Sequence, residues 1–309
     1  MLALLYTPRE QTLIEFVTFM KILAESGATK TDWRSIASDG TVYSMRSTGM
    51  NVATADVAFV EKTLREAIPK LNPSGETVER IHFYAAGMIP TPGNPVPEGA
   101  VRLHGEFMKA FPEAKVAYAS DLLAAARALF GRKPGIAVIL GTGSNSCEYD
   151  GKQIVKNVRS GGFILGDEGG GASLGRQFVS DFLKGIVPEP VASEFAAKYD
   201  MEYFHVVKNV YRGPSPASYL GSFAPFVTEH YDSCLYVKCL VDNNFRALFE
   251  RCLLQYDIEG KPVGVVGGFG FAHKEILLRV AQEYGVGISD IVSSPIEGLV
   301  KYHIEENEN

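Results

Sequence analysis

The sequence predicts an α/β protein built from two related halves. Short apolar runs typical of strands alternate with Ala/Leu-rich segments typical of helices along most of the chain. A pattern of strand, glycine, small polar loop, strand and Asp-Gly turn also occurs twice, beginning near residues 21 and 136. The chain has 309 residues, which exceeds one small core and suits two domains.

The first half is expected to begin at Met20 and to end with a helix before the breaker sequence GRKPG (131–135), our predicted domain boundary. Within it we expect a Ser38-Asp39-Gly40 turn between two strands. The predicted strands are Lys21–Ala24, Asp32–Ala37, 80–87 and 115–120, and the predicted helices are Thr54–Ala67 and Asp121–Phe130.

The second half, 131–309, is expected to repeat the first and to carry a helical insertion, with the last helix packing back on the first domain. Its predicted strands are 136–140, 147–154 (interrupted by Asp150-Gly151) and 262–268, with a turn at 141–146 and a last strand near residue 290. Helices are expected from the glycines at 169–171 to about Lys184, over most of 190–255 with a break at 212–221, from Ala272 to about Tyr284, and at the C-terminus.

Residues 1–19 lack a basic region and a long apolar run, so they do not form a good signal peptide. We expect them to lie outside the fold as an N-terminal extension. The alternative is an amphipathic leader helix that packs on the surface.

The composition excludes several classes of protein. Charged residues make up 21% of the chain, the net charge is −6, and basic residues are not clustered, which argues against a nucleic-acid partner. No apolar run reaches 18 residues, so no transmembrane helix and no membrane partner are expected. The four cysteines (147, 234, 239 and 252) form no C-x-x-C pair. We therefore expect no disulfide framework and a cytoplasmic location.

The first small polar loop is Gly27-Ala28-Thr29-Lys30-Thr31. It is either an ordinary hairpin turn or a loop that presents N–H and O–H groups to phosphate oxygens. It is not a P-loop, since G-x-x-x-x-G-K-[ST] is absent. The second copy, Gly141-Thr142-Gly143-Ser144-Asn145, favours the phosphate interpretation.

Carboxylate side chains indicate two further candidate functional positions. Asp121 lies where a strand passes into a helix, so it is either an N-cap or a general base. Asp167 and Glu168 stand between glycines, where they could bind sugar hydroxyls, hold hydrated Mg²⁺, or only favour a helix N-terminus. The flanking glycines favour a ligand. Gly267-Gly268-Phe269-Gly270 precedes a helix and could border a nucleotide base or ribose, and the six histidines show no metal-ligand spacing.

The order of these motifs resembles the sugar kinase/Hsp70/actin superfamily. More closely, the chain is similar to a bacterial N-acetylglucosamine kinase of the BadF/BadG/BcrA/BcrD ATPase group over nearly all of 20–303. "ILGTGSNS", "GFILGDEG" and "SPIEGL" are its most specific parts. This resemblance implies two ribonuclease-H-like (actin/hexokinase-type) domains with ATP and Mg²⁺ in the cleft between them.

The resemblance also implies roles for individual residues. The loops Gly27–Thr31 and Gly141–Ser144 would bind phosphate, and Gly267–Phe269 would border the adenosine. Asp121 would activate the 6-hydroxyl of the sugar. The sugar contacts would come from Gly49, Asn51, Asn145, Asp167 and Glu168. A homodimer through the helical second domain is compatible with the family.

One residue departs from the family pattern. An aspartate that helps to hold hydrated Mg²⁺ usually occupies the position of Glu25, and glutamate reaches one methylene further. Because Mg²⁺ requires near-ideal octahedral geometry, this difference bears on the metal site.

The predicted function is ATP-dependent phosphorylation of N-acetylglucosamine at the 6-hydroxyl. Two alternatives remain open at this stage. One is an ATPase activator of a 2-hydroxyacyl-CoA dehydratase, which needs a cysteine-held iron–sulfur cluster. The other is a non-catalytic sugar or nucleotide sensor. Glucosamine, glucose, mannosamine and a muramyl sugar also remain open as acceptors.

Overall fold

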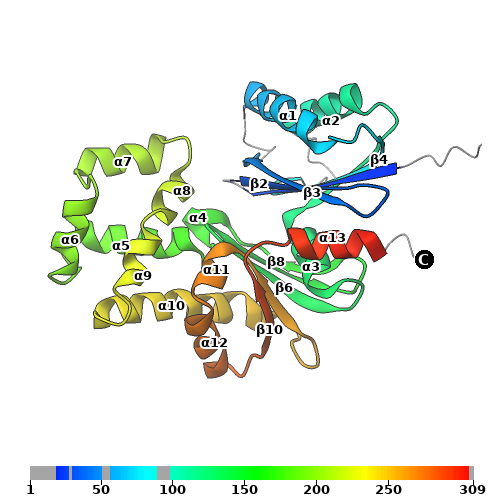
Figure 1. The fold of residues 1–309 in the computed structure, drawn as a ribbon. Helices are drawn as coiled ribbons and strands as arrows, with labels where there is room; N and C mark the ends of the chain where they lie inside the picture. Colours follow the sequence, from blue (N-terminus) through cyan, green and yellow to red (C-terminus); the bar gives the residue numbers. More distant parts are fainter. Residues whose placement is uncertain (1–18, 28–29, 51–55, 89–97, 306–309) are drawn as a thin grey trace, which may run out of the picture.

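Two five-stranded sheets form the framework of the protein (Figure 1). The computed structural model describes residues 19–27, 30–50, 56–88 and 98–305. The predicted extension therefore lies outside the described residues, except for Phe19, which begins the first strand and pairs with Thr77. No helix in these described ranges is long and apolar enough to cross a bilayer.

The first sheet has the strand order β3-β2-β1-β4-β5. Strands β1, β2 and β3 are antiparallel neighbours, whereas β4 and β5 run parallel to β1. A buried core that includes Trp33, Phe83 and Phe107 joins one face of the sheet to two helices. These elements are β1 (Phe19–Ser26), β2 (Lys30–Ile36), β3 (Val42–Thr48), β4 (Thr77–Ala85), β5 (Lys115–Ser120), α1 (Val57–Leu71) and α2 (Glu98–Ala110).

The second sheet has the order β10-β9-β6-β7-β8. Read from β8, it repeats the first sheet strand for strand, because β6, β7 and β8 are antiparallel neighbours and β9 and β10 run parallel to β6. The topology thus confirms the internal repeat. The strands are β6 (Gly135–Leu140), β7 (Ser144–Tyr149), β8 (Ile154–Val158), β9 (Val263–Val266) and β10 (Ile288–Val292).

A group of helices packs on the second sheet and forms its large apolar core (Figure 1). Most of this group lies between β8 and β9, where the sequence predicts a mostly helical segment. Its members are α4 (Gly162–Leu165), α5 (Gly171–Leu183), α6 (Val191–Lys198), α7 (Tyr203–Arg212), α8 (Pro216–Gly221), α9 (Ala224–Glu229), α10 (Leu235–Arg251), η1 (Leu253–Gln255), α11 (Gly268–Ala272) and α12 (Lys274–Glu283).

Two further helices, α3 (Asp121–Phe130) and α13 (Ile296–Ile304), connect the two halves. Helix α3 packs against strands of both sheets, and α13 packs on α3, β1 and β2. Ile296 and Val300 of α13 bury their side chains against Leu23 and Ile36 of the first sheet. Gly298 allows the close approach, since a Cβ there would lie 2.4 Å from the carbonyl oxygen of Ala128 in α3.

The structure corrects several predicted boundaries. The predicted strand 147–154 is wrong: it is the end of β7, a turn and the start of β8. Asp150 accepts hydrogen bonds from the amides of Lys152 and Gln153, and Gly151 has φ +97°, which reverses the chain. Ser144–Ser146, predicted as part of a turn, already pair with β6.

Two predicted helices also change. The helix predicted from Ala272 is divided into α11 and α12 at His273, whose φ and ψ are not helical. The helix predicted over Thr54–Ala67 begins after its N-cap Asp56 and continues to Leu71, and its predicted start lies outside the described residues. The predicted break at 212–221 contains the short helix α8.

Candidate functional site

A cleft of about 980 Å³ lies between the two halves, and both β-hairpin loops reach it. Gly27 and Lys30 come from the β1–β2 hairpin of the first sheet, and 141–145 come from the equivalent β6–β7 hairpin of the second. Its volume suits a nucleotide or sugar ligand. The sequence-predicted residues that line it are Glu25, Gly27, Lys30, Asp121, Gly141, Thr142, Gly143, Ser144, Asn145, Asp167, Gly267, Gly268 and Phe269.

Three predicted site residues do not line the cleft. Thr31 points to the opposite face of β2 from Lys30, where its hydroxyl lies 2.7 Å from Ser26 Oγ and donates to the carbonyl of Thr48. Glu168 faces a separate hollow and pairs with Arg251 at 3.3 Å. Gly49 is buried outside the lining. The predicted residues Ala28, Thr29 and Asn51 lie outside the described residues.

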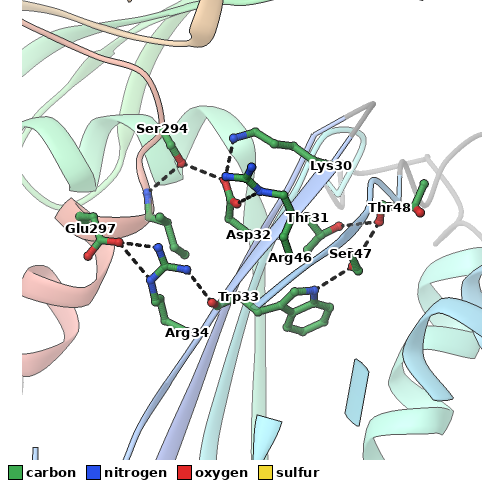
Figure 2. Close-up of polar contacts among 11 residues, drawn as sticks. Lys30, Thr31, Asp32, Trp33, Arg34, Arg46, Ser47, Thr48, Ser294 and Glu297 are labelled. Atoms are coloured by element: carbon green, nitrogen blue, oxygen red, sulfur yellow. Dashed lines mark hydrogen bonds and ion pairs between the residues drawn. The ribbon is translucent and has the colours of Figure 1, made fainter. Parts of the chain in front are cut away.

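Asp32 holds the polar side of the first hairpin together (Figure 2). Its buried carboxylate accepts from Lys30 Nζ at 2.8 Å and from Arg46 Nε at 2.7 Å. Ser294, from the segment that precedes α13, donates to the same carboxylate at 3.2 Å. Although burial alone would raise the pKa of Asp32, the hydrogen bonds from Lys30 and Arg46 lower it. Asp32 is therefore ionised and fully engaged by protein groups.

The second loop is braced against the N-terminus of α5. The amides of Gly171 and Ala172 donate to the carbonyls of Gly141 and Thr142 at 2.9 and 2.8 Å. At Gly143 a Cβ would lie 2.7 Å from Asp167 Oδ2, so only glycine fits beside that carboxylate. The loop thus presents backbone groups to the cleft at a fixed position.

Asp167 is held in an unusual backbone conformation. It has φ +56°, which no other non-glycine residue has in the part of the chain that the structure describes. Its Oδ1 accepts from the amide of Ser144 at 3.3 Å, and burial raises the pKa of its carboxyl group. Such strain concentrates at ligand-binding sites, where the surrounding structure maintains it.

The structure shows that Asp121 is not the N-cap of α3, and its role as a general base stays a prediction. The N-cap of α3 is Ser120, whose hydroxyl oxygen accepts from the amide of Leu123 at 3.1 Å. Asp121 is the first helical residue; its Oδ1 accepts from the amide of Leu122, and the side chain lines the cleft. Burial raises the pKa of Asp121, in the direction that favours a proton acceptor.

Replacing Ser120 should therefore affect folding more than the cleft. We expect Ser120→Ala to lower the free energy of unfolding by about 1 kcal/mol, because an N-cap hydrogen bond is lost. Urea unfolding followed by circular dichroism measures this loss. A loss equally large in Asp121→Ala would mean that the Asp121 carboxylate caps the helix as strongly as Ser120 does.

Glu25 lies on β1 directly opposite Asp32 on β2. It is therefore the last member of a row of charged side chains that crosses the first sheet. Burial, then the nearby carboxylates of Asp121 and Asp32, raise the pKa of Glu25 to about 7, although Lys30 acts in the opposite direction. Glu25 and Asp121 therefore place two crowded carboxyl groups in the cleft. Such hard oxygen donors suit Mg²⁺, which usually takes one or two carboxylates and keeps several waters.

The raised pKa has a consequence for stability. Since the folded-state pKa of Glu25 lies above its ordinary value of 4.5, the folded protein favours the protonated form. The stabilisation of the folded protein by protonated Glu25 is complete below about pH 4.5 and is lost as the pH rises through about 7. Without metal, Glu25→Gln should therefore become increasingly stable relative to the parent protein from pH 5 to pH 8. Urea unfolding with EDTA tests this, and parallel pH profiles would contradict it.

The far end of the cleft is formed by the glycine-rich start of α11. Gly267 has φ +137°, and a Cβ there would lie 2.3 Å from the carbonyl oxygen of Leu140. Phe269 and His273 also line this end, and their rings pack edge to face with centroids 4.6 Å apart. Burial lowers the pKa of His273, so the imidazole is neutral at physiological pH.

Several lining residues were not assigned a role from the sequence. They come from the loop before α4 and the first residue of α4, from α9, from the junction of α11 and α12, and from the segment before α13. The motif SPIEGL contains part of the last group, but its residue types alone indicate no chemistry. These residues are Ser160, Gly162, Ala224, Pro225, Thr228, Glu229, His273, Ser293, Ser294 and Pro295.

Comparison with solved structures identifies the family. A Porphyromonas gingivalis protein named as a proposed N-acetylglucosamine kinase is 36% identical and superposes with a TM-score of 0.84. The match covers 93% of this chain and 99% of the other. The chain belongs to the bacterial N-acetylglucosamine kinase family of sugar kinases. This confirms the sugar kinase/Hsp70/actin superfamily and the two ribonuclease-H-like domains.

More distant members of the sugar kinase superfamily share the fold. A Chromobacterium violaceum protein, also named as a proposed N-acetylglucosamine kinase, is 20% identical with a TM-score of 0.65, over 92% of this chain and 98% of its own. A Streptomyces griseus ROK family glucokinase is 14% identical with a TM-score of 0.58, over 94% and 100% of the two chains. No family model matches this kinase, and no curated protein matches its sequence.

Proposed function

We propose that this sugar kinase transfers the γ-phosphoryl group of ATP to the 6-hydroxyl of N-acetylglucosamine. The observation that carries the proposal is the meeting of both hairpin loops and Asp121 in one cleft. The 36% identity to the Porphyromonas gingivalis protein supports the choice of sugar.

In this proposal the two halves divide the binding of ATP and sugar. Lys30 and the Gly141–Ser144 loop, through the amides of Thr142 and Gly143, bind the β- and γ-phosphates, and Gly267–Phe269 border the adenosine. Asp167 and Asn145 bind sugar hydroxyls. Glu168 has no role, because it faces the hollow beside Arg251.

Asp121 acts as the proton acceptor. The sugar 6-oxygen attacks the γ-phosphorus while the bond from that phosphorus to the β-bridging oxygen breaks and ADP leaves. The hydroxyl proton passes to Asp121 late in the transfer. Such reactions depend mainly on positioning and charge stabilisation.

Mg²⁺ would neutralise charge on the phosphates when bound. Glu25 is the residue we propose to hold it through water, beside Asp121. Within 19–27, 30–50, 56–88 and 98–305, no three His, Cys, Asp or Glu side chains gather as metal ligands. This agrees with a metal held largely by phosphate and water.

The dehydratase-activator alternative receives less support. It needs an iron–sulfur cluster held by cysteine thiolates. Cys147 and Cys252 are buried, and burial raises the pKa of Cys147 to about 12 and that of Cys252 to about 11, whereas Cys234 is half-buried and Cys239 is exposed. Among the described residues, the cysteines do not gather into a group of three or more metal ligands. Absorbance near 400 nm in anaerobically purified protein would revive this alternative.

The decisive experiment couples ADP release to a panel of hexoses and N-acetylhexosamines with Mg²⁺-ATP. We expect release that depends on N-acetylglucosamine, and phosphorus NMR of the product should place the phosphate on the 6-oxygen. Release with another sugar only would reject N-acetylglucosamine as the acceptor. ATP or sugar binding without any turnover would favour the sensor alternative, and Glu25→Asp would then be tested for recovered activity.

A further inference from the structure

One face of β2 carries three charged side chains at alternate positions, Lys30, Asp32 and Arg34. The opposite face carries Trp33, which is buried in the core of the first half. The charged face is therefore the one turned toward the cleft and α13, and Figure 2 shows its side chains in contact with Ser294 and Glu297.

Asp32 is the centre of this face. Its side chain is 3% exposed, whereas those of Lys30 and Arg46 are 40% and 67% exposed. A buried carboxylate is costly unless it is paired and hydrogen-bonded. Here the three donors come from three separate segments: β2, β3 and the segment after β10.

The side chain most affected by this arrangement is that of Lys30, whose ammonium group becomes fixed in position. A lysine side chain loses much of its rotamer freedom when it is fixed in one place. One donor of its ammonium group is engaged by Asp32, and an ammonium group has three. Since Lys30 also lines the cleft, Asp32 fixes the ammonium before a ligand arrives.

Ser294 connects this arrangement to the other half. It lies between β10 of the second sheet and α13, and it lines the cleft together with Lys30. Its hydroxyl donates to the same oxygen, Asp32 Oδ2, that accepts from Lys30. A second connection runs parallel to it, from Arg34 to Glu297 at 3.0 Å. The position of the Asp32 carboxylate thus depends on a group beyond the first sheet.

We propose that Asp32 is a positioning residue. Held by a hydrogen bond from Ser294, its carboxylate keeps the Lys30 ammonium in place to bind the terminal phosphates of ATP. This inference rests on the proposed function, in which Lys30 binds the β- and γ-phosphates. It assigns to Asp32 and Ser294 a role in nucleotide affinity that acts only through Lys30.

The test is a double-mutant cycle read by calorimetric titration with a non-hydrolysable ATP analogue and with AMP. Asp32→Asn keeps the size of the side chain but removes the charge. We expect it to raise the Kd of the ATP analogue roughly tenfold and to leave the Kd of AMP unchanged. In a Lys30→Met background, Asp32→Asn should cause no further change.

Two single variants complete the design. Ser294→Ala should raise the Kd of the ATP analogue in the same direction by a smaller factor, again only when Lys30 is present. This variant keeps the test valid if Asp32→Asn does not fold. Arg46→Gln is the matched control: it removes the other charged partner of Asp32, which does not line the cleft, and should leave both Kd values unchanged.

The possible failures are distinguishable. If the parent protein binds no ATP analogue, the proposed function fails. If it binds the analogue but the effects of Asp32→Asn and Lys30→Met are additive, the inference is overturned. It is equally overturned if Arg46→Gln weakens binding as much as Asp32→Asn does.

Discussion

Asp121→Asn should reduce kcat with N-acetylglucosamine by roughly 10²–10⁴-fold while the Kd of ATP stays unchanged. An amide has nearly the same shape as the carboxylate, and its oxygen can still accept from the amide of Leu122. It cannot take the proton of the sugar hydroxyl. The free energy of unfolding should not fall, because the substitution removes a buried charge that also lies near Glu25.

Asp150→Asn is the matched control for this variant. Asp150 also accepts backbone amide hydrogen bonds, from Lys152 and Gln153, but it lies in the exposed turn between β7 and β8. The kcat of Asp150→Asn should equal that of the parent protein. Steady-state kinetics with saturating ATP and sugar measures both variants, and normal turnover in Asp121→Asn would exclude Asp121 as the proton acceptor.

Gly267→Ala should destabilise the protein by about 3 kcal/mol and sharply weaken ATP binding. A backbone φ of +137° is accessible almost only to glycine, which accounts for part of the cost. The rest is steric, since the new methyl group would lie 2.3 Å from the carbonyl oxygen of Leu140. Relief of this clash moves Gly268 and Phe269, which line the cleft.

Gly285→Ala is a comparison variant with a positive φ but without the steric clash. Gly285 also has a positive φ, +67°, but a Cβ there would meet nothing within 4 Å. Gly285→Ala should lower the free energy of unfolding by about 1 kcal/mol, with no change in ATP affinity. Thermal and urea unfolding give the stabilities, and calorimetry gives the affinities. Equal losses for the two variants would show that steric contact with Leu140 contributes nothing.

Local patterns were sufficient to predict much of the fold. The strand 115–120 and the helix Asp121–Phe130 have the predicted bounds, because a β-rich run meets an Ala/Leu-rich run at a polar N-cap. The Asp-Gly turn after β7 was misread as an interruption, since its effect depends on how β8 pairs. The same chemistry gives the correctly predicted turn at Asp39-Gly40, where the amide of Thr41 donates to Asp39 Oδ1 and Gly40 has φ +85°.

Residues of the candidate site could be predicted where the residue type itself indicates both a chemical role and a backbone conformation. Glycines and carboxylates such as Gly143 and Asp167 carry a local signal, and the structure brings them together. Thr31 could not be excluded from the sequence, because the face to which it points depends on strand register. Ser294 and Asp32 are 262 residues apart. No local pattern indicates their contact.

The position of α13 also determines when the protein can assemble. Chains emerge from the ribosome N-terminal end first, and domains generally fold as units in that order. Strands β1 and β2 are made early, but α13, which buries Leu23 and Ile36, follows every strand of both sheets. The apolar patch formed by Leu23 and Ile36 on the otherwise charged face of the first sheet therefore stays uncovered until the residues of α13 have emerged. Helix α13 covers this patch only after both sheets have emerged, so the cleft can be completed only once β10 and α13 have been made.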